Sequence, residues 1–357
     1  MRFLYFLIAL PFFSVQAYAD SLHPPPGYYQ PVIEKKRESF TCETPPPPFT
    51  GTLAFTSKYQ GSGPSQDQLN PQAFAEYQES TKAVDDLEKG IVVMTNKYMK
   101  QGDPQRLECI LSWMAAWSDA HALEQPTNDY MGKAVRKWAL GSLSGAYLRL
   151  EFSRSEPLQA YPEQNKKIEA WLGRLGEQVM SDWNIDSSSS HKINNHYYWA
   201  AWAVMATSVV LNRQDMFDWS LKTYDYFTTQ VDKDGYLPNE LARKTRAFSY
   251  HQYALLPLSM IAAFARANNI NEASRGNNAI GRVAKVVLKG MDDKSDFEAK
   301  TGIKQQTDEI THNSRQAWIP PFCYAEPCFD AVEQRLNTYG VISNTNLGGE
   351  VTTIFQQ

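Results

Sequence analysis

Two short stretches of the sequence concentrate side chains that could carry out acid–base chemistry. The first, NNHYYWAAW, runs from Asn194 to Trp202 and sets two amides and an imidazole before an apolar run. The second, RKTRAFSYHQYAL, runs from Arg243 to Leu255 and combines two arginines with two tyrosines. Helix capping and core packing explain an asparagine and an aromatic ring in the first stretch, but they give its Asn-His pair no role. Both stretches are therefore candidates for a catalytic site.

The side-chain types favour an anionic sugar as the ligand. Aromatic faces stack on sugar rings, and cationic side chains bind carboxylates through charge-assisted hydrogen bonds. Paired carboxylates, which are typical of glycoside hydrolases, are not prominent in either stretch. Polymers of uronic acids fit better, because a uronate carries a C5 proton beside its carboxylate and a leaving oxygen at C4. The expected chemistry is elimination rather than hydrolysis.

Elimination on a uronate needs three functions. The carboxylate must be neutralised so that charge can develop at C5, a base must remove the C5 proton, and an acid must protonate O4. Asn195 and Arg243 suit the first function, and Tyr250 can serve the other two. Because a free tyrosine titrates near pH ~10, a tyrosine base needs stabilising neighbours, which Arg243 and His196 could supply. A rival assignment makes His196 the base and Tyr250 only the acid.

Composition and targeting signals limit the classes of protein that fit. The chain has 357 residues, 43% of them hydrophobic, and a formal net charge of −4, so we expect a large packed core and no nucleic-acid partner. Its start, MRFLYFLIALPFFSVQAYAD, predicts a signal peptide over residues 1–19. No later run is apolar for long enough to predict a membrane span. We therefore expect a mature protein of residues 20–357 in the periplasm or outside the cell.

The four cysteines predict two disulfides in that oxidising compartment. Three pairings are possible, and we favour Cys323 with Cys328 and Cys42 with Cys109, because the second bond would fasten a proline-rich arm to a helix. No zinc-binding motif is present, and we expect no metal.

Helical patterns follow one another from about residue 72, which predicts a nearly all-α fold. Residues 195–211 are apolar on every side and residues 215–231 on one face only, which predicts an inner and an outer helix. Residues 107–123 and 132–150 resemble inner elements, and residues 164–183 resemble an outer one. This alternation favours helical hairpins in a double-layered toroid around a cleft, with a single-layer bundle as the alternative.

Two segments between the helical patterns have a distinct composition. The loop Thr56 to Asn70 contains two glycines and carries Lys58, which makes it a candidate lid, although a plain surface loop is the alternative. The sequence GSLSG at residues 141–145 has leucine at its centre, so it is not a serine nucleophile motif. Its small residues predict tight packing instead.

Long motifs along nearly the whole mature chain resemble those of polysaccharide lyase family five, the alginate lyases. They are PPPGYY, FTSKY, KWALGSLSGAY, INNHYYWAAW, NRQDMFDW, DGYLPNELARK, YHQYAL and LGGEVT. The resemblance implies a single-domain, incomplete α/α toroid that cleaves poly-β-D-mannuronate by β-elimination without a cofactor or essential metal. It also implies a periplasmic enzyme whose partners include alginate itself and components of alginate biosynthesis and secretion.

The resemblance also assigns roles to individual residues. It implies a catalytic group made of Asn195, His196, Arg243 and Tyr250. It implies substrate binding by Lys58, Trp199 and Tyr253, with Lys137 and Trp138 as further candidates in a matched motif. The chain departs from the family at Asn346, where an arginine is expected just before LGGE, so one sugar contact is missing or supplied elsewhere.

Two alternatives remain open on the sequence alone. The chain could be a lyase of the same fold that acts on another polyuronate, such as polyglucuronate or hyaluronan, because specificity depends on contacts like the one changed at Asn346. It could also be a non-catalytic periplasmic component that binds or exports polysaccharide, although the presence of all four candidate catalytic residues argues against this.

Overall fold

The computed structural model describes residues 21–33, 40–306 and 312–355. The predicted signal peptide lies outside these residues. The longer helices are α1 (Pro71–Gln101), α2 (Pro104–Asp119), α3 (Tyr130–Glu151), α4 (Pro162–Asp182), α5 (Asn195–Leu211), α6 (Gln214–Gln230), α8 (Ala247–Ala267) and α9 (Arg275–Asp292). The shorter α-helices are α7 (Pro238–Leu241), α10 (Ser295–Thr301), α11 (Ile319–Ala325), α12 (Asp330–Tyr339) and α13 (Thr352–Phe355).

The remaining regular elements are short. The 3-10 helices are η1 (Pro26–Tyr29), η2 (Pro157–Ala160), η3 (Ile185–Ser187), η4 (Ser190–Lys192), η5 (Lys244–Arg246), η6 (Asn313–Gln316) and η7 (Thr345–Leu347). Strands β1 (Ser343–Asn344) and β2 (Gly349–Glu350) form an antiparallel pair in which Ser343 lies opposite Glu350. The prediction of an all-α chain is confirmed.

Side-chain caps fix where several long helices begin. The carboxylates of Asp103 and Asp129 accept hydrogen bonds from backbone amides in the first turns of α2 and α3, and the side chain of Asn194 does the same for α5. Such caps satisfy backbone donors that have no partner within the helix. Helix α5 ends at Leu211, and the next residue, Asn212, caps it in a left-handed conformation with φ of 51°. The cap of α5 therefore sets the position of the Asn-His pair that follows it.

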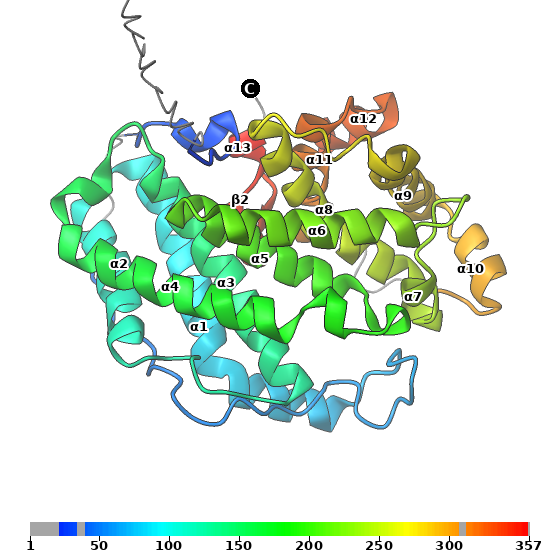
Figure 1. Ribbon diagram of the computed structural model, residues 1–357, viewed down its shortest axis with the longest axis horizontal. Coiled ribbons are helices and arrows are strands. Elements are labelled where there is room, and N and C mark those ends of the chain that lie inside the picture. Colours follow the sequence, from blue (N-terminus) through cyan, green and yellow to red (C-terminus); the bar gives the residue numbers. More distant parts are fainter. Residues whose placement is uncertain (1–20, 34–39, 307–311, 356–357) are drawn as a thin grey trace, which may run out of the picture.

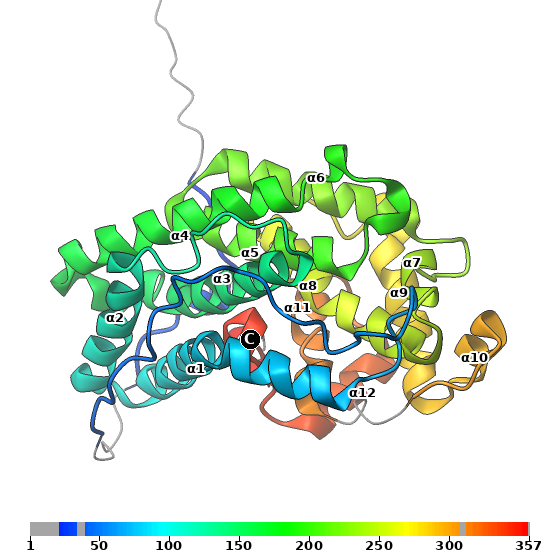
Figure 2. The same ribbon diagram turned by 90° about the horizontal axis from the view of Figure 1, so that it is seen from below.

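The helices form two layers. Helices α1, α3, α5 and α8 pack side by side in chain order, and each pairs with an outer helix, α2, α4, α6 or α9. Figure 1 shows α4 and α6 crossing in front of α3 and α5, and Figure 2 shows the same two helices along one side of the inner layer. Every residue from Tyr197 to Val210 in α5 is buried, as its uniformly apolar sequence predicts. The double-layered toroid is confirmed, and the single-layer bundle is excluded.

Helix α2 corrects the prediction that residues 107–123 form an inner element. It packs on α1 and α4 in the outer layer. Its apolar surface is nevertheless covered, because the proline-rich arm lies over it: the indole nitrogens of Trp113 and Trp117 donate to the backbone oxygens of Glu43 (3.0 Å) and Pro46 (2.9 Å). The two tryptophans therefore hold the arm on α2.

Both predicted disulfides are present, Cys42 with Cys109 and Cys323 with Cys328. The first fastens the proline-rich arm to α2, which is the function that favoured this pairing. Among the described residues, no helix combines the length and the apolar character needed to cross a membrane.

The small residues of the GSLSG stretch pack against α5, where Ser144 hydrogen-bonds to Thr207 at 2.8 Å, and also receive the C-terminal segment. A Cβ atom on Gly145 would lie 2.9 Å from both the Cα of Gly348 and the backbone oxygen of Leu347. Gly348 itself has a φ of 88°, which favours glycine. The segment therefore packs backbone to backbone against α3, and η7 also touches α1 and α8.

We predict that Gly145→Ala lowers the free energy of unfolding by roughly 1–3 kcal/mol, because the neighbouring atoms belong to the backbone and cannot move aside cheaply. Gly173→Ala on α4 is the control, because its new methyl group would meet only a flexible methyl of Leu211 at 3.2 Å. Denaturant unfolding of both variants measures the difference. Equal stabilities would contradict the close packing of the C-terminal segment on α3.

Candidate functional site

A cavity of about 190 Å³ lies where the loop of residues 56–70 meets α3, α5 and α8. Six of the nine residues predicted to act on or bind a sugar line it. They are Lys58, Trp138, His196, Arg243, Tyr250 and Tyr253. The sequence motifs thus come together at one place although they are far apart along the chain.

The other three predicted residues are buried behind the cavity wall. Asn195, Trp199 and Lys137 are each at most 1% exposed, and none of them lines the cavity. Trp199 and Lys137 therefore support the cavity from behind in this structure, and their role in sugar binding stays a prediction. Trp199 packs beneath Tyr253, with ring centroids 4.9 Å apart, so it supports a cavity-lining ring instead of presenting its own face.

Tyr250 lies in the first turn of α8 with its hydroxyl in the cavity. The hydroxyl donates a hydrogen bond to the hydroxyl of Tyr59 at 3.1 Å. The guanidinium carbon of Arg243 lies 3.6 Å from the centroid of the Tyr250 ring, within the range of a cation–π contact. A phenol oxygen with a hydroxyl partner and a cation against its ring is suited to carry negative charge during a reaction.

Arg243 also holds the loop of residues 56–70 in place. Its Nε and Nη2 atoms donate to the backbone oxygens of Ser65 (2.8 Å) and Gln66 (2.6 Å). Arg246 donates from Nε to the backbone oxygen of Asp67 at 2.9 Å. The loop is thus fastened to the segment before α8 through hydrogen bonds, without an apolar core of its own.

The carboxylate of Asp67 strengthens this attachment. Its Oδ2 accepts a hydrogen bond from the hydroxyl of Thr245 at 3.0 Å, and its Oδ1 accepts one from Ser65 at 2.6 Å. Burial raises the pKa of Asp67, but these hydrogen bonds outweigh that effect and lower it to about 2. The carboxylate is therefore ionised wherever the protein is expected to work.

His196 lies in the first turn of α5, half-buried among aromatic rings. Its imidazole stacks on Trp183, with the centroids 5.5 Å apart and the planes 17° apart, and Tyr130 and Trp138 also contact it. Its Nδ1 atom lies 2.7 Å from the amino nitrogen of Lys137. Burial, together with the charges of Lys137 and Arg243, lowers the pKa of His196 well below its ordinary value. The imidazole is therefore neutral.

Asn195 is turned toward a glutamate that sequence reasoning missed. The backbone amide of Asn195 donates to Oε1 of Glu240 at 2.6 Å, and its side-chain amide donates to both carboxylate oxygens at 3.1 and 3.0 Å. Burial raises the pKa of Glu240, and the charge of Arg243 opposes that rise. Glu240 lies three residues before Arg243 in the motif DGYLPNELARK, and this position in the sequence could have identified it as a site residue.

Asn346 borders a second cavity, of about 170 Å³, that shares Tyr77, Trp138 and Tyr253 with the first. The Asn346 amide donates to Glu88 and to Ser142, at 3.2 Å each. None of the described residues that line this second cavity is a cation.

Arg315 supplies a cation to the main cavity from another direction. Its guanidinium carbon lies 5.1 Å from the centroid of the Tyr253 ring. Sequence reasoning missed Arg315, because it belongs to no motif and lies in a short 3-10 helix. Arg315 is therefore a candidate for the sugar contact that an arginine at position 346 is expected to make.

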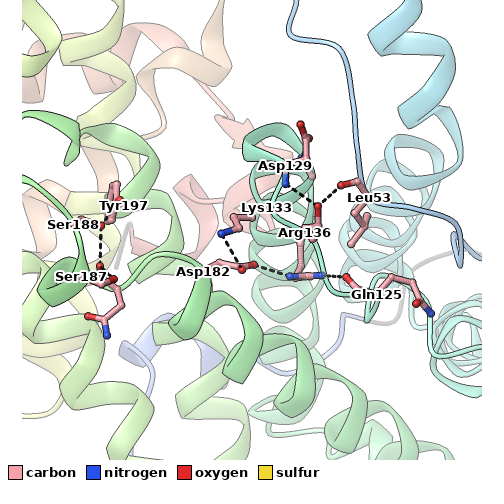
Figure 3. Close-up of polar contacts among 12 residues, drawn as sticks. Leu53, Gln125, Asp129, Lys133, Arg136, Asp182, Ser187, Ser188 and Tyr197 are labelled. Atoms are coloured by element: carbon pink, nitrogen blue, oxygen red, sulfur yellow. Dashed lines mark hydrogen bonds and ion pairs between the residues drawn. The ribbon is translucent and has the colours of Figure 1, made fainter.

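Salt bridges hold α3 and α4 together behind His196. Asp182, at the end of α4, accepts a hydrogen bond from Nη1 of Arg136 at 2.6 Å and lies 3.7 Å from the amino group of Lys133 (Figure 3). Trp183 follows Asp182 directly, so this network sets the position of the indole on which His196 stacks.

Comparison with known proteins identifies close relatives. The alginate lyase family model matches residues 54–297. The alginate lyase of Pseudomonas aeruginosa is 45% identical over 95% of this chain and 92% of its own, and that of Azotobacter vinelandii is 43% identical over 94% and 90%. The crystal structure of alginate lyase A1-III from Sphingomonas species A1 superposes with a TM-score of 0.73 and 20% identity, covering 91% of this chain and 89% of that chain. At that identity, the structural likeness concerns the fold alone.

The second cavity generates a prediction about pH. Burial raises the pKa of Glu88 from 4.5 to about 8, against the lowering effect of the hydrogen bond from Ser142. The folded protein therefore keeps a proton that the unfolded chain releases, so the free energy of unfolding falls as pH rises between these two values. Glu88→Gln lacks this titration, and we expect its stability relative to the parent protein to increase on the order of 1 kcal/mol per pH unit across that window.

The measurement is thermal or denaturant unfolding of both proteins at several pH values in that window. Glu79→Gln, an exposed position on the same helix, is the control and should track the parent protein throughout. A constant difference between Glu88→Gln and the parent would show that Glu88 is ionised in the folded state.

Proposed function

Because this chain belongs to the alginate lyase family, we propose that it cleaves the mannuronate-rich parts of alginate by β-elimination. The products would be oligosaccharides with an unsaturated uronic acid at the new non-reducing end. The observation that carries the proposal is the meeting of Tyr250, Arg243 and His196 in one cavity. Family membership also argues against the non-catalytic interpretation, because the curated relatives are lyases.

The proposed reaction uses one tyrosine for both proton transfers. In β-mannuronate the C5 proton and O4 lie on the same side of the ring, so one residue can reach both. Tyr250, as phenolate, takes the C5 proton; the C5–H electron pair becomes the C4–C5 double bond, the C4–O4 bond breaks, and Tyr250 returns the proton to O4. In guluronate the two groups lie on opposite sides, so a single residue cannot serve both steps.

The neighbours of Tyr250 support its role as base. The cation of Arg243 against the ring stabilises negative charge on the phenol oxygen, and the hydroxyl of Tyr59 can reverse its hydrogen bond and donate to the phenolate. The substrate carboxylate would be neutralised by donors from Arg243 and His196. Asn195 is also proposed for this function; its side-chain amide donates to Glu240 in this structure, so it would have to turn from Glu240 to donate to a sugar carboxylate.

We further propose that the loop of residues 56–70 acts as a lid. Lys58 and Tyr59 line the cavity, so the loop would touch bound polymer, and its attachment through hydrogen bonds from Arg243 and Arg246 can be exchanged for contacts with a ligand. Lys58, Trp138 and Tyr253 would bind the sugar.

The proposed location is the periplasm. Two disulfides are typical of proteins outside the cytosol, and they support an extracytoplasmic protein. In that compartment, components of alginate biosynthesis and secretion are the proposed partners.

Another polyuronate is kept as an alternative substrate because of Asn346. The second cavity has two acidic side chains, Asp85 and Glu88, and no cation among its described lining residues. Such a pocket favours a sugar hydroxyl over a sugar carboxylate. A sugar bound there therefore does not need to point a carboxylate toward α1. The identity of the polymer is thus set by the main cavity and by Arg315.

Tyr250→Phe is expected to lower kcat by roughly 10⁴-fold or more, because general base and general acid each contribute about 10²–10⁴. Binding of mannuronate chains should persist. The ultraviolet absorbance of the unsaturated product measures turnover, and calorimetry measures binding. Tyr226→Phe, which removes a hydroxyl on α6 that does not line the cavity, is the control.

A substrate with a better leaving group at C4 then separates the two assignments of the base. If Tyr250 is both base and acid, the better leaving group gives little rescue of Tyr250→Phe, because proton removal is still lost. Strong rescue would mean that Tyr250 is only the acid and that another group, such as His196, is the base.

Lys58→Ala is expected to weaken binding, raising KM several-fold while some turnover remains, because its ammonium group would contact polymer rather than the reacting atoms. Steady-state kinetics on long and short substrates measure this, with the exposed Lys166→Ala as the control for loss of a surface charge. Parent-like kinetics on both substrates would refute the proposed contact of the lid with the polymer.

A further inference from the structure

Lys137 is a buried amine whose partner is an imidazole instead of a carboxylate. It lies in the middle of α3, is 0% exposed, and points its amino group at Nδ1 of His196 from 2.7 Å. The same amino group lies 4.5 Å from the ring centroid of Trp138 and 4.0 Å from that of Trp183. Among the described residues, it forms no ion pair with a carboxylate.

The surroundings of Lys137 explain why no carboxylate reaches it. The nearest acidic group that acts on it is Asp182, which is already bound by Arg136 and Lys133. Besides Lys137, the charge of Arg243 also lowers the pKa of His196. Burying a lysine without a carboxylate is costly, so its retention calls for a function beyond packing.

We propose that Lys137 is a positioning residue that fixes His196 in the tautomer with its proton on Nε2. A neutral imidazole has one donor nitrogen and one acceptor nitrogen, and a lysine ammonium can only donate. When the amino group of Lys137 donates to Nδ1, that nitrogen must be the acceptor, and the proton must lie on Nε2. His196 then has an N–H group, and no lone pair, on its remaining nitrogen.

The aromatic rings around the amino group favour this direction of the hydrogen bond. The faces of Trp138 and Trp183 attract a cation, which keeps Lys137 in its donating form, while burial lowers its pKa and acts against it. The reverse arrangement, with Nδ1–H donating to a neutral amine, would leave a basic lone pair on Nε2. The two arrangements therefore give His196 opposite chemical functions.

The consequence bears on the reaction, and in this respect the inference rests on the proposed function. A neutral His196 with Nε2–H can donate to the substrate carboxylate as charge develops at C5, and no proton leaves it during the step. Proton removal is then left to Tyr250. Lys137 thus decides between the two assignments of the base without touching the substrate.

The test is the tautomer of His196 measured by nitrogen-15 NMR with labelled histidine, the signal being assigned by its loss in His196→Ala. The parent protein should show a protonated Nε2 and an unprotonated Nδ1. Lys137→Met keeps the length of the side chain and removes its donors, so the proton should redistribute between the two nitrogens. We expect kcat to fall at least about 10-fold, as when an orienting partner of a histidine is removed, with little change in KM.

Lys133→Met is the matched control. It removes a lysine one turn earlier on α3 that also interacts with Asp182 but does not contact His196. It should keep the parent tautomer, because Lys137 still lies at Nδ1 of His196.

Two results would overturn the proposal. One is a parent spectrum with the proton on Nδ1, which decides the matter even if Lys137→Met does not fold. The other is a folded Lys137→Met that keeps the Nε2–H tautomer, whatever its activity. Because the spectrum needs no substrate, a Lys137-dependent tautomer in a protein that cleaves no polyuronate would refute the proposed function and leave this inference standing.

Discussion

The candidate site depends on one constraint, which is that a fully buried helix starts at the cavity. Helix α5 is apolar on all sides and is surrounded by α3, α4, α6 and α8, so it has no freedom to rotate or slide. The side chain of Asn194 caps its first turn, and Asn195 and His196 follow directly. Their directions are thus set by the packing of the entire inner layer, which is how a polar pair can be held rigidly at the edge of an apolar core.

Polar groups in and behind the cavity wall then determine what the cavity-lining side chains can do. Glu240 holds the amide of Asn195, Lys137 holds the imidazole of His196, and Arg243 links the ring of Tyr250 to the loop above it. Each of these contacts is made where water is largely excluded, so each is stronger than it would be at the surface. The proposed chemistry therefore depends on two sets of residues. Those that line the cavity would contact a sugar, and those behind them would not.

Hydrophobic periodicity predicted the helical class and the two layers, the cysteine count and the expected compartment predicted both disulfides, and the side-chain types predicted that the two polar motifs share a site. Sequence-based prediction failed where the surroundings of a residue depend on a segment that is distant in the chain. The apolar surface of α2 predicts an inner face, but the proline-rich arm covers it. Motif membership also does not distinguish a residue that lines the cavity from one that lies behind it, as Lys137 and Trp199 do. Glu240 and Arg315 were missed for the same reason: their positions depend on tertiary packing.

In the proposed mechanism, one tyrosine serves both proton transfers on the same side of the sugar ring. Initial rates of the parent protein on purified polymannuronate, polyguluronate, polyglucuronate and hyaluronan, followed by the absorbance of the unsaturated product, test it most directly. We expect rapid cleavage of polymannuronate and slow cleavage of polyguluronate, in which the C5 proton and O4 lie on opposite sides. Comparable rates on polymannuronate and polyguluronate would contradict it.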